Sequence, residues 1–332
     1  MTTSPIASRL SPKLRRAFEG LGVGAAQFGN MGKVTPEQDC LAAVDTAWEL
    51  GLRFYDTAPH YGLGLSEQRL GKALKGRSPD DYVISTKVGR LLEPNPAPQG
   101  SDEANGFHVA DDLTRRRDYT AEGVRQSLEA SLARLDMASV DILWIHDPEE
   151  PTDRFEEALA GAVPELERLR EQGRIAAWGV GSKDAGMLKR FVDQARPDLI
   201  MLAGRYTLLE QEQTGLMSAC LERQVGVVAV GAFNSGLLAR DEPPADAWYE
   251  YGQAPEAVLE RARELAAVAR AHGVSLPAAA LAFPWRHPAV VNVMAGMRSP
   301  EQVKRNHALA SCDIPEAFWN ELQARGLLKE NT

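Results

Sequence analysis

The sequence predicts an α/β protein folded as a single (β/α)8 TIM barrel with long loops over the C-terminal mouth. Eight short apolar runs alternate with longer amphipathic segments along the chain. Runs this short, rich in Val, Ile and aromatic residues, are typical of strands buried on both faces of a parallel sheet. The length of 332 residues suits eight strand–helix units, and no linker-like stretch divides them. We therefore expect one domain over residues 1–332.

The predicted strands are five to eight residues long and rich in apolar side chains. They cover residues 23–28, 54–58, 82–88, 141–147, 176–182, 199–206, 227–233 and 290–297. Because parallel strands need crossover connections, a helix is expected between each pair. A doubly wound sheet is the alternative, but the stretch from Gly22 to Gln27 lacks the last glycine of the dinucleotide-binding pattern Gly-x-Gly-x-x-Gly.

Several expected helices carry start and stop signals. Thr35-Pro36-Glu37-Gln38 is a capping box with proline at the first helical position, and Gly51 ends that helix. Ser299-Pro300-Glu301-Gln302 is a second capping box directly after the last strand. Apolar residues at helical spacing predict a helix from Val124 to Leu135. Further helices are expected near 65–75, 154–172, 184–196, 211–223 and 255–272.

Two inserts interrupt the regular alternation. The stretch 90–119 contains three prolines and two glycines near its start, and we expect an irregular loop over the barrel mouth. A polar insert at 240–254 follows the seventh strand. Loops of this length in a compact domain are usually functional.

Composition and charge exclude several classes of function. The 46 acidic and 37 basic residues give a net charge of −9, which argues against nucleic-acid binding and against an electrostatic membrane anchor. No apolar run approaches the roughly 18 residues of a membrane span, and the first 30 residues lack a signal pattern, so a cytoplasmic protein is expected. Three widely spaced cysteines predict neither a disulfide framework nor a zinc knuckle.

Four titratable residues fall where predicted strands end, which is where barrel enzymes place their active sites. They are Asp56, Tyr61, Lys87 and His146. Each alone has an ordinary structural explanation, such as a helix cap for Asp56 or packing for Tyr61. Strand alternation, however, points Asp56, Lys87 and His146 toward the same interior. A buried Lys87 would need a counter-ion, and Asp56 is the nearest candidate.

The segments that contain these residues resemble the aldo-keto reductase family. The stretch GLRFYDTAPHYG from Gly51 to Gly62, continued by SEQRLG from Ser66 to Gly71, is similar to that family's signature. The stretches STKV from Ser85 and WIHD from Trp144 match its next two motifs in order and spacing. The stretch AGRYTLLE from Ala203 resembles a branch that contains aldose 1-dehydrogenases and pyridoxal 4-dehydrogenase.

This resemblance implies a nicotinamide-dependent oxidoreductase. Tyr61 would be the general acid and base, Asp56 would hold Lys87, and His146 would orient the substrate oxygen. A free phenol has a pKa near 10, and a neighbouring Lys87 cation would lower the pKa of Tyr61. The substrate would be a small polar alcohol or aldehyde, either a sugar or an aromatic compound. Asn30, Met31, His60 and Trp144 are the expected substrate contacts.

The same resemblance implies a cofactor site over the last two strands. The expected contacts are Gly24, Ala25, Ser182, Tyr206, Gly231, Ala232, Asn234, Gly236, Leu237, Gly296, Arg298, Gln302 and Asn306. Tyr206 is expected to stack on the nicotinamide and Ser182 to bind its carboxamide. Relatives that prefer NADP often carry Lys and Arg where this chain has Gly296 and Gln302. We therefore expect NAD, with NADP as the alternative supported by Arg298.

Three functions remain open at this point. The first is an aldose 1-dehydrogenase or pyridoxal 4-dehydrogenase, the second an NADPH-dependent aldehyde reductase. The third is a non-catalytic, cofactor-binding regulatory subunit, which the intact set of four residues disfavours. No metal site is expected, because only His60 and His146 of the six histidines fall near the predicted mouth. Assembly into a homo-oligomer is left open.

Overall fold

Eight parallel strands close into a barrel, as the sequence predicts. The computed structural model describes residues 4–211, 215–250 and 252–329. The strands follow one another around the barrel in the order β1-β12-β9-β8-β7-β6-β3-β2, and every neighbouring pair is parallel. They are β1 (Gly22–Gly24), β2 (Phe54–Asp56), β3 (Val83–Val88), β6 (Ile142–His146), β7 (Ala177–Ser182), β8 (Leu199–Ala203), β9 (Gly226–Val230) and β12 (Val290–Gly296). The (β/α)8 prediction is confirmed.

Three strands end at least three residues earlier than the apolar pattern predicts. The expected strand 23–28 stops at Gly24, because Ala26–Gly29 form a 3-10 turn. The expected strands 199–206 and 227–233 stop at Ala203 and Val230. Each is followed by a glycine in the left-handed region, Gly204 with φ +68° and Gly231 with φ +76°, so the chain leaves the sheet there.

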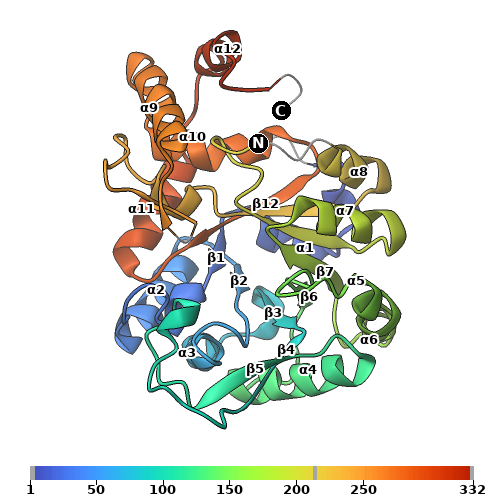
Figure 1. Ribbon diagram of the computed structural model, residues 1–332. Helices are drawn as coiled ribbons and strands as arrows, with labels where there is room; N and C mark the ends of the chain where they lie inside the picture. The colour runs from blue at the N-terminus through green and yellow to red at the C-terminus, as the bar shows by residue number, and fades with distance from the viewer. Residues whose placement is uncertain (1–3, 212–214, 251, 330–332) are drawn as a thin grey trace.

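Helices surround the barrel on its outside (Figure 1). The predicted helices are found as α2 (Glu37–Glu49), α3 (Leu65–Leu74), α4 (Ala121–Leu135), α7 (Ala185–Gln194), α8 (Leu216–Arg223), α9 (Glu256–Ala271) and α11 (Pro300–Ala310). Residues 212–214, in the helix expected over 211–223, lie outside the described residues. The expected helix 154–172 is interrupted: α5 (Phe155–Glu157) and α6 (Val163–Glu171) flank a π-helical turn at Ala158–Ala162. Pro164 follows this turn and has no N–H to donate.

Three helices were not expected from the sequence: α1 (Pro12–Phe18), α10 (Leu276–Ala282) and α12 (Glu316–Ala324). They add to the outer layer and do not change the barrel. Within the described residues, no single helix is long and apolar enough to cross a membrane. The bent pair Glu256–Ala271 with Leu276–Arg286 is long and apolar enough only when the two segments are taken together.

One of the two predicted capping boxes is present in part, because the Gln302 side chain accepts from the Arg298 backbone N–H at 2.9 Å instead of from that of Ser299. Ser299 caps α11 by accepting from the Gln302 backbone N–H at 3.4 Å. The prediction for Thr35 is wrong, because α2 begins after Pro36 without a side-chain cap. The Thr35 hydroxyl instead lies 3.3 Å from the Arg298 guanidinium and accepts from it.

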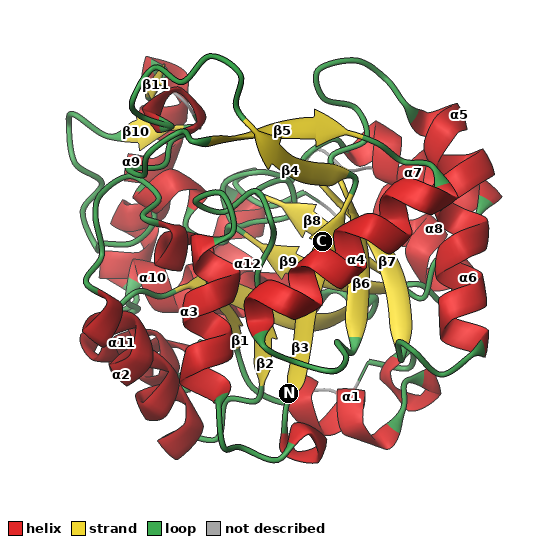
Figure 2. Ribbon diagram, turned by 90° about the horizontal axis from the view of Figure 1, so that it is seen from below, coloured by secondary structure: helices red, strands yellow, loops and turns green. Residues whose placement is uncertain are grey.

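Both inserts are more ordered than expected. Within 90–119, β4 (Arg90–Pro94) and β5 (Leu113–Arg117) pair as an antiparallel hairpin, so the prediction of an irregular loop is wrong at both ends of the insert. Within 240–254, β10 (Trp248–Tyr249) pairs with β11 (Gly252–Gln253). Figure 2 shows both inserts at one end of the barrel and α1 at the other. The inserts follow β3 and β9 and thus frame the end where the strands finish.

Candidate active site

Lys87 and Asp56 form a buried ion pair at the centre of the barrel mouth. Asp56 ends β2 and lies beside Ser85 in the register of the sheet, which places Lys87 within reach. The Lys87 ammonium donates to the Asp56 carboxylate and, at 2.9 Å, to the Thr57 carbonyl. The Ser85 hydroxyl donates to the second Asp56 oxygen at 2.7 Å. The expected pairing is present, and its hydrogen bonds offset the cost of burying two charges.

Tyr61 lies above this pair, in the turn that follows β2. The Lys87 ammonium is 4.9 Å from the centroid of its ring. The position of the turn depends on a close approach between Gly62, with φ +61°, and Gly29. A Cβ atom at Gly62 would lie 2.3 Å from the Gly29 carbonyl oxygen, so only glycine fits there.

His146 completes the predicted set of four. Its ring centroid lies 6.0 Å from that of Tyr61, with the two rings edge to face at 84°. It ends β6, whose neighbour β3 carries Lys87 opposite Trp144. The structure thus brings Asp56, Tyr61, Lys87 and His146 together from three consecutive strands of the barrel.

The site raises the pKa of Tyr61 and lowers the pKa of His146. Burial raises the pKa of Tyr61 above its ordinary value, and Lys87 opposes this rise without cancelling it. Lys87 therefore lowers the pKa of Tyr61 as expected, but burial raises it by more. Burial, followed by the Arg90 and Lys87 charges, holds the pKa of His146 well below its ordinary range. At neutral pH the site presents a protonated phenol and a neutral imidazole.

The segment after His146 is held in a left-handed conformation. Asp147 has φ +42°, which is unfavourable for a residue other than glycine. The Tyr119 hydroxyl lies 2.7 Å from the His146 carbonyl and 3.0 Å from the Asp147 carbonyl and hydrogen-bonds to them. The Asp147 carboxylate pairs with the buried Arg90 guanidinium. Tyr119 and Arg90 therefore fix the position of the strand end that carries His146.

We expect Tyr119→Phe to lower kcat about fivefold, since losing hydrogen bonds worth about 1 kcal/mol lets the strand end relax. KM and dinucleotide affinity should stay unchanged. The measurement is steady-state kinetics alongside the melting temperature. Tyr55→Phe is the matched control, because the buried Tyr55 hydroxyl donates to a carbonyl, that of Leu52, away from the site. Equal kcat in both variants would show that Tyr119 does not position His146.

A cavity of about 610 Å³ opens beside Tyr61 and Asp56. Nine of the expected cofactor residues line it: Gly24, Gly231, Ala232, Asn234, Gly236, Gly296, Arg298, Gln302 and Asn306. Gln27, Met201, Val230 and Arg305 also line it and were not expected. Arg305 was detectable, since it lies three residues after Gln302 on the same helix face. Gln27 carried no comparable signal, because its place depends on the 3-10 turn after β1.

Four expected cofactor residues do not line the cavity: Ala25, Ser182, Tyr206 and Leu237. Ala25 and Leu237 are buried beside residues that do. The prediction that Tyr206 stacks on the nicotinamide is wrong. The chain turns at Gly204, and the Tyr206 ring packs on Phe283 at 5.1 Å and on His287 at 5.8 Å. Val230 instead faces the cavity at the end of β9.

The cavity suits a nicotinamide dinucleotide. Gly231, Asn234, Ser235 and Gly236 all have positive φ, a backbone arrangement that directs N–H groups toward anions. The buried side-chain oxygens of Gln27 and Asn234 have no hydrogen-bond partner within the described ranges. The first turn of α11 adds free N–H groups for a phosphate or ribose.

The expected substrate residues occupy different surroundings. Met31 is partly exposed and lines the cavity, and the His60 ring lies 5.7 Å from that of His146. Trp144 is fully buried beneath the site. The Asn30 prediction is not supported by the structure, because its side chain is held by Thr35, Arg69 and His108 away from the cavity. Across the described ranges, no group of three His, Cys, Asp or Glu residues could hold a metal ion.

Comparisons with known proteins agree with this arrangement. The chain is 46% identical over 315 residues to a D-threo-aldose 1-dehydrogenase from a Pseudomonas species, covering 94% of this chain and 95% of the relative. It is 34% identical to a pyridoxal 4-dehydrogenase from Microbacterium luteolum, covering 93% and 94%. A solved aldo-keto reductase from Bacillus halodurans, in its holo form, superposes with a TM-score of 0.73 at 25% identity, covering 94% and 93%.

The family model described as "Aldo/keto reductase family" matches residues 20–325. This match spans all eight barrel strands and all four residues at the mouth. The chain therefore belongs to the aldo/keto reductase family, whose members are oxidoreductases that use NAD(P).

Proposed function

We propose that this protein oxidises an aldose at its anomeric carbon to the lactone, with NAD as the hydride acceptor. The proposal rests on one observation: Tyr61 and Asp56 line the same cavity as the residues expected to bind the dinucleotide. The 46% identity to an aldose dehydrogenase along nearly the whole chain supports the sugar substrate. A cytoplasmic location remains a prediction.

The proton transfer is assigned to the Tyr61 hydroxyl. When bound, the nicotinamide accepts the hydride in oxidation and supplies it in reduction. Tyr61 Oη takes the proton of the anomeric hydroxyl during oxidation and returns a proton to the carbonyl oxygen in reduction. Lys87 stabilises the phenolate, and Asp56 keeps the ammonium in place. Burial alone would lower the pKa of Lys87, but Asp56 and Tyr61 raise it above its ordinary value, so the ammonium stays charged.

His146 holds the substrate oxygen next to Tyr61. A neutral imidazole can donate an N–H hydrogen bond to that oxygen without repelling Lys87. Such positioned proton transfer contributes about 10²–10⁴-fold to a reaction rate.

The preference for NAD is supported by the surroundings of Arg298. Its guanidinium donates to the Met31 carbonyl at 2.9 Å and the Thr35 hydroxyl at 3.3 Å. The Arg305 guanidinium donates to the Ala239 carbonyl. Both cations are thus engaged by neutral oxygens, and a 2′-phosphate would have to compete for them.

We expect NADH to bind at least about tenfold more tightly than NADPH, which corresponds to about 1.4 kcal/mol. A fluorescence titration with each dinucleotide measures this difference. Gln302→Arg should reduce the difference between NADH and NADPH affinity by adding a cation at the start of α11. Tighter binding of NADPH by the wild-type protein would favour the aldehyde-reductase alternative.

The substrate proposal is tested by following NADH formation with L-fucose, D-arabinose, L-galactose and pyridoxal. We expect turnover of the aldoses and release of the lactone. Turnover of pyridoxal alone would assign the second dehydrogenase activity. Failure of every sugar and alcohol in such a panel, despite dinucleotide binding, would leave the regulatory-subunit alternative.

A further inference from the structure

Buried polar atoms without partners gather around His146. Within the described residues, they include His60 Nδ1, His146 Nδ1 and Glu149 Oε2. More than about nine in ten buried polar groups in proteins are hydrogen-bonded, so a cluster of exceptions calls for an explanation. In an enzyme active site, the common explanation is that a ligand supplies the missing partners.

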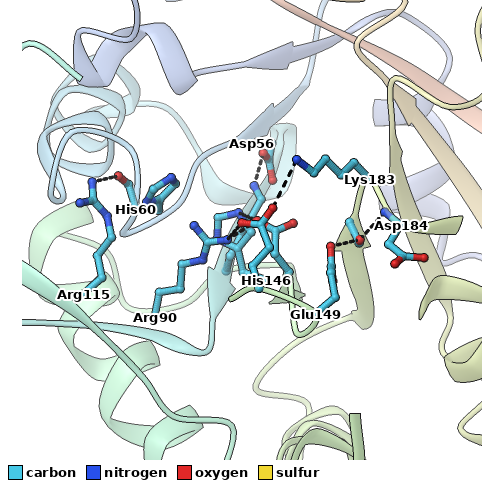
Figure 3. Close-up of polar contacts among 12 residues, drawn as sticks. Asp56, His60, Arg90, Arg115, His146, Glu149, Lys183 and Asp184 are labelled. Carbon is cyan, nitrogen blue, oxygen red and sulfur yellow. Dashed lines mark hydrogen bonds and ion pairs between the residues drawn. The ribbon is translucent and has the colours of Figure 1, made fainter. Parts of the chain in front are cut away.

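His60 is held firmly beside the catalytic groups. Its ring lies 5.1 Å from Phe107, 5.7 Å from His146 and 6.1 Å from Tyr61. Its backbone carbonyl accepts from the Arg115 guanidinium at 2.9 Å (Figure 3). Burial lowers the pKa of His60 well below its ordinary value, so the ring is neutral and offers one donor and one acceptor.

Glu149 differs from its acidic neighbours. Asp147 and Glu150 both pair with Arg90, and Glu150 also lies 3.4 Å from Lys183. The described part of the chain provides no ion-pair partner for Glu149. One Glu149 oxygen accepts from the Ser182 hydroxyl, which in turn accepts from the Asp184 backbone N–H at 2.7 Å. The other oxygen is buried and free, and burial raises the pKa of this carboxyl to about 7.

Neither residue lines the dinucleotide cavity, although both belong to loops that carry catalytic groups. His60 directly precedes Tyr61, and Glu149 follows His146 by three residues. In the view of Figure 3, the two side chains lie on either side of His146. His60 therefore lies beside Tyr61 and His146, and Glu149 lies across His146 from it.

We propose that His60 and Glu149 form a subsite that binds the hydroxyl groups next to the reacting carbon and selects polyhydroxylated substrates. The inference rests on the proposed function and extends it to the residues that recognise the sugar. The free Glu149 oxygen accepts a hydrogen bond from one hydroxyl, and the His60 imidazole contacts another. A plain aldehyde leaves both groups unpaired, which costs binding energy in a site built for hydroxyl groups.

The test compares an aldose with an aldehyde that has no hydroxyl groups. We measure kcat/KM for L-fucose oxidation and for propanal reduction in the wild type, Glu149→Met, Glu149→Gln and His60→Phe. The phenylalanine keeps the ring contacts of His60, and the glutamine keeps the shape of Glu149 if the methionine variant misfolds. Glu93→Gln is the control, since Glu93 is an exposed carboxylate that pairs with Arg116 on the hairpin.

We expect the ratio of L-fucose to propanal kcat/KM to fall about 2- to 10-fold in Glu149→Met and in His60→Phe, because each change removes one hydrogen bond. The loss should appear mainly in KM, with a smaller fall in Glu149→Gln and none in Glu93→Gln. An unchanged ratio in both substitutions overturns the subsite.

Binding of NADH by each variant, measured by fluorescence, separates a substrate role from a cofactor role. A loss of NADH affinity in Glu149→Met with an unchanged substrate ratio would assign Glu149 to the cofactor and overturn the proposal. A wild-type protein that reduces propanal but oxidises no aldose would refute the proposed function itself. Aldose oxidation with unaltered variant ratios would refute the subsite alone.

Discussion

Tyr61→Phe lowers kcat for aldose oxidation by about 10²–10⁴-fold, because the change removes the hydroxyl to which the proton transfer is assigned. The phenyl ring keeps the packing of Tyr61 against His146 and Phe107. Dinucleotide affinity should therefore remain within about twofold of the wild type. Steady-state kinetics and a fluorescence titration with NADH measure the two quantities.

The pH profile distinguishes this proton-transfer role from a packing role. Burial raises the pKa of Tyr61, so the phenolate that oxidation needs becomes more abundant as the pH rises above neutrality. Oxidation by the wild type should accelerate with pH, whereas reduction, which needs the protonated phenol, should slow. Both trends should vanish in Tyr61→Phe. Tyr82→Phe, at a distant buried tyrosine whose hydroxyl contacts the Met137 sulfur, serves as the control. Near wild-type oxidation by Tyr61→Phe would refute the assignment.

Lys87→Met should abolish most activity and also destabilise the protein. Both side chains of the Lys87–Asp56 pair are almost inaccessible, at 3% and 4% exposed. Removing one partner of such a pair leaves an uncompensated buried charge and costs about 3–5 kcal/mol of unfolding free energy. Tyr61 also loses the cation that stabilises its phenolate. Chemical denaturation and steady-state kinetics report the two effects separately.

A double variant separates stability from catalysis. Lys87→Met combined with Asp56→Asn removes both charges, so we expect much of the lost stability to return while activity stays low. Lys72→Met is the control, because Lys72 pairs with Glu37 on the surface, where ion pairs contribute about 0–1 kcal/mol. Equal destabilisation in Lys87→Met and Lys72→Met would contradict the role given to the buried pair.

The barrel and the four catalytic residues could be predicted from the sequence because both depend on local patterns. Short apolar runs mark the eight strands, and strand alternation places Asp56, Lys87 and His146 on the inner face. The capping motif at Ser299 places the start of α11 correctly. Gly231 and Gly236 mark the loop after β9, because positive φ favours glycine.

The errors arise where the path of the chain depends on distant contacts. Tyr206 lies close in sequence to the end of β8, but the turn at Gly204 sends its ring onto Phe283. Thr35 has the side chain of a helix cap, yet its hydroxyl accepts a hydrogen bond from Arg298, which lies near the other end of the sequence. The pKa of Tyr61 depends on how deeply the site is buried, which a motif does not reveal.

The location of the bound dinucleotide is the most direct test of the account. A crystal structure of the NAD complex should show the nicotinamide ring against Tyr61, the phosphates over residues 231–236 and the adenosine beside Arg298 and Asn306. An aldose soaked into the same crystals should place its anomeric carbon between the nicotinamide ring and Tyr61. A dinucleotide bound elsewhere, or a nicotinamide ring remote from Tyr61, would contradict the assignment of this cavity and of the four residues beside it.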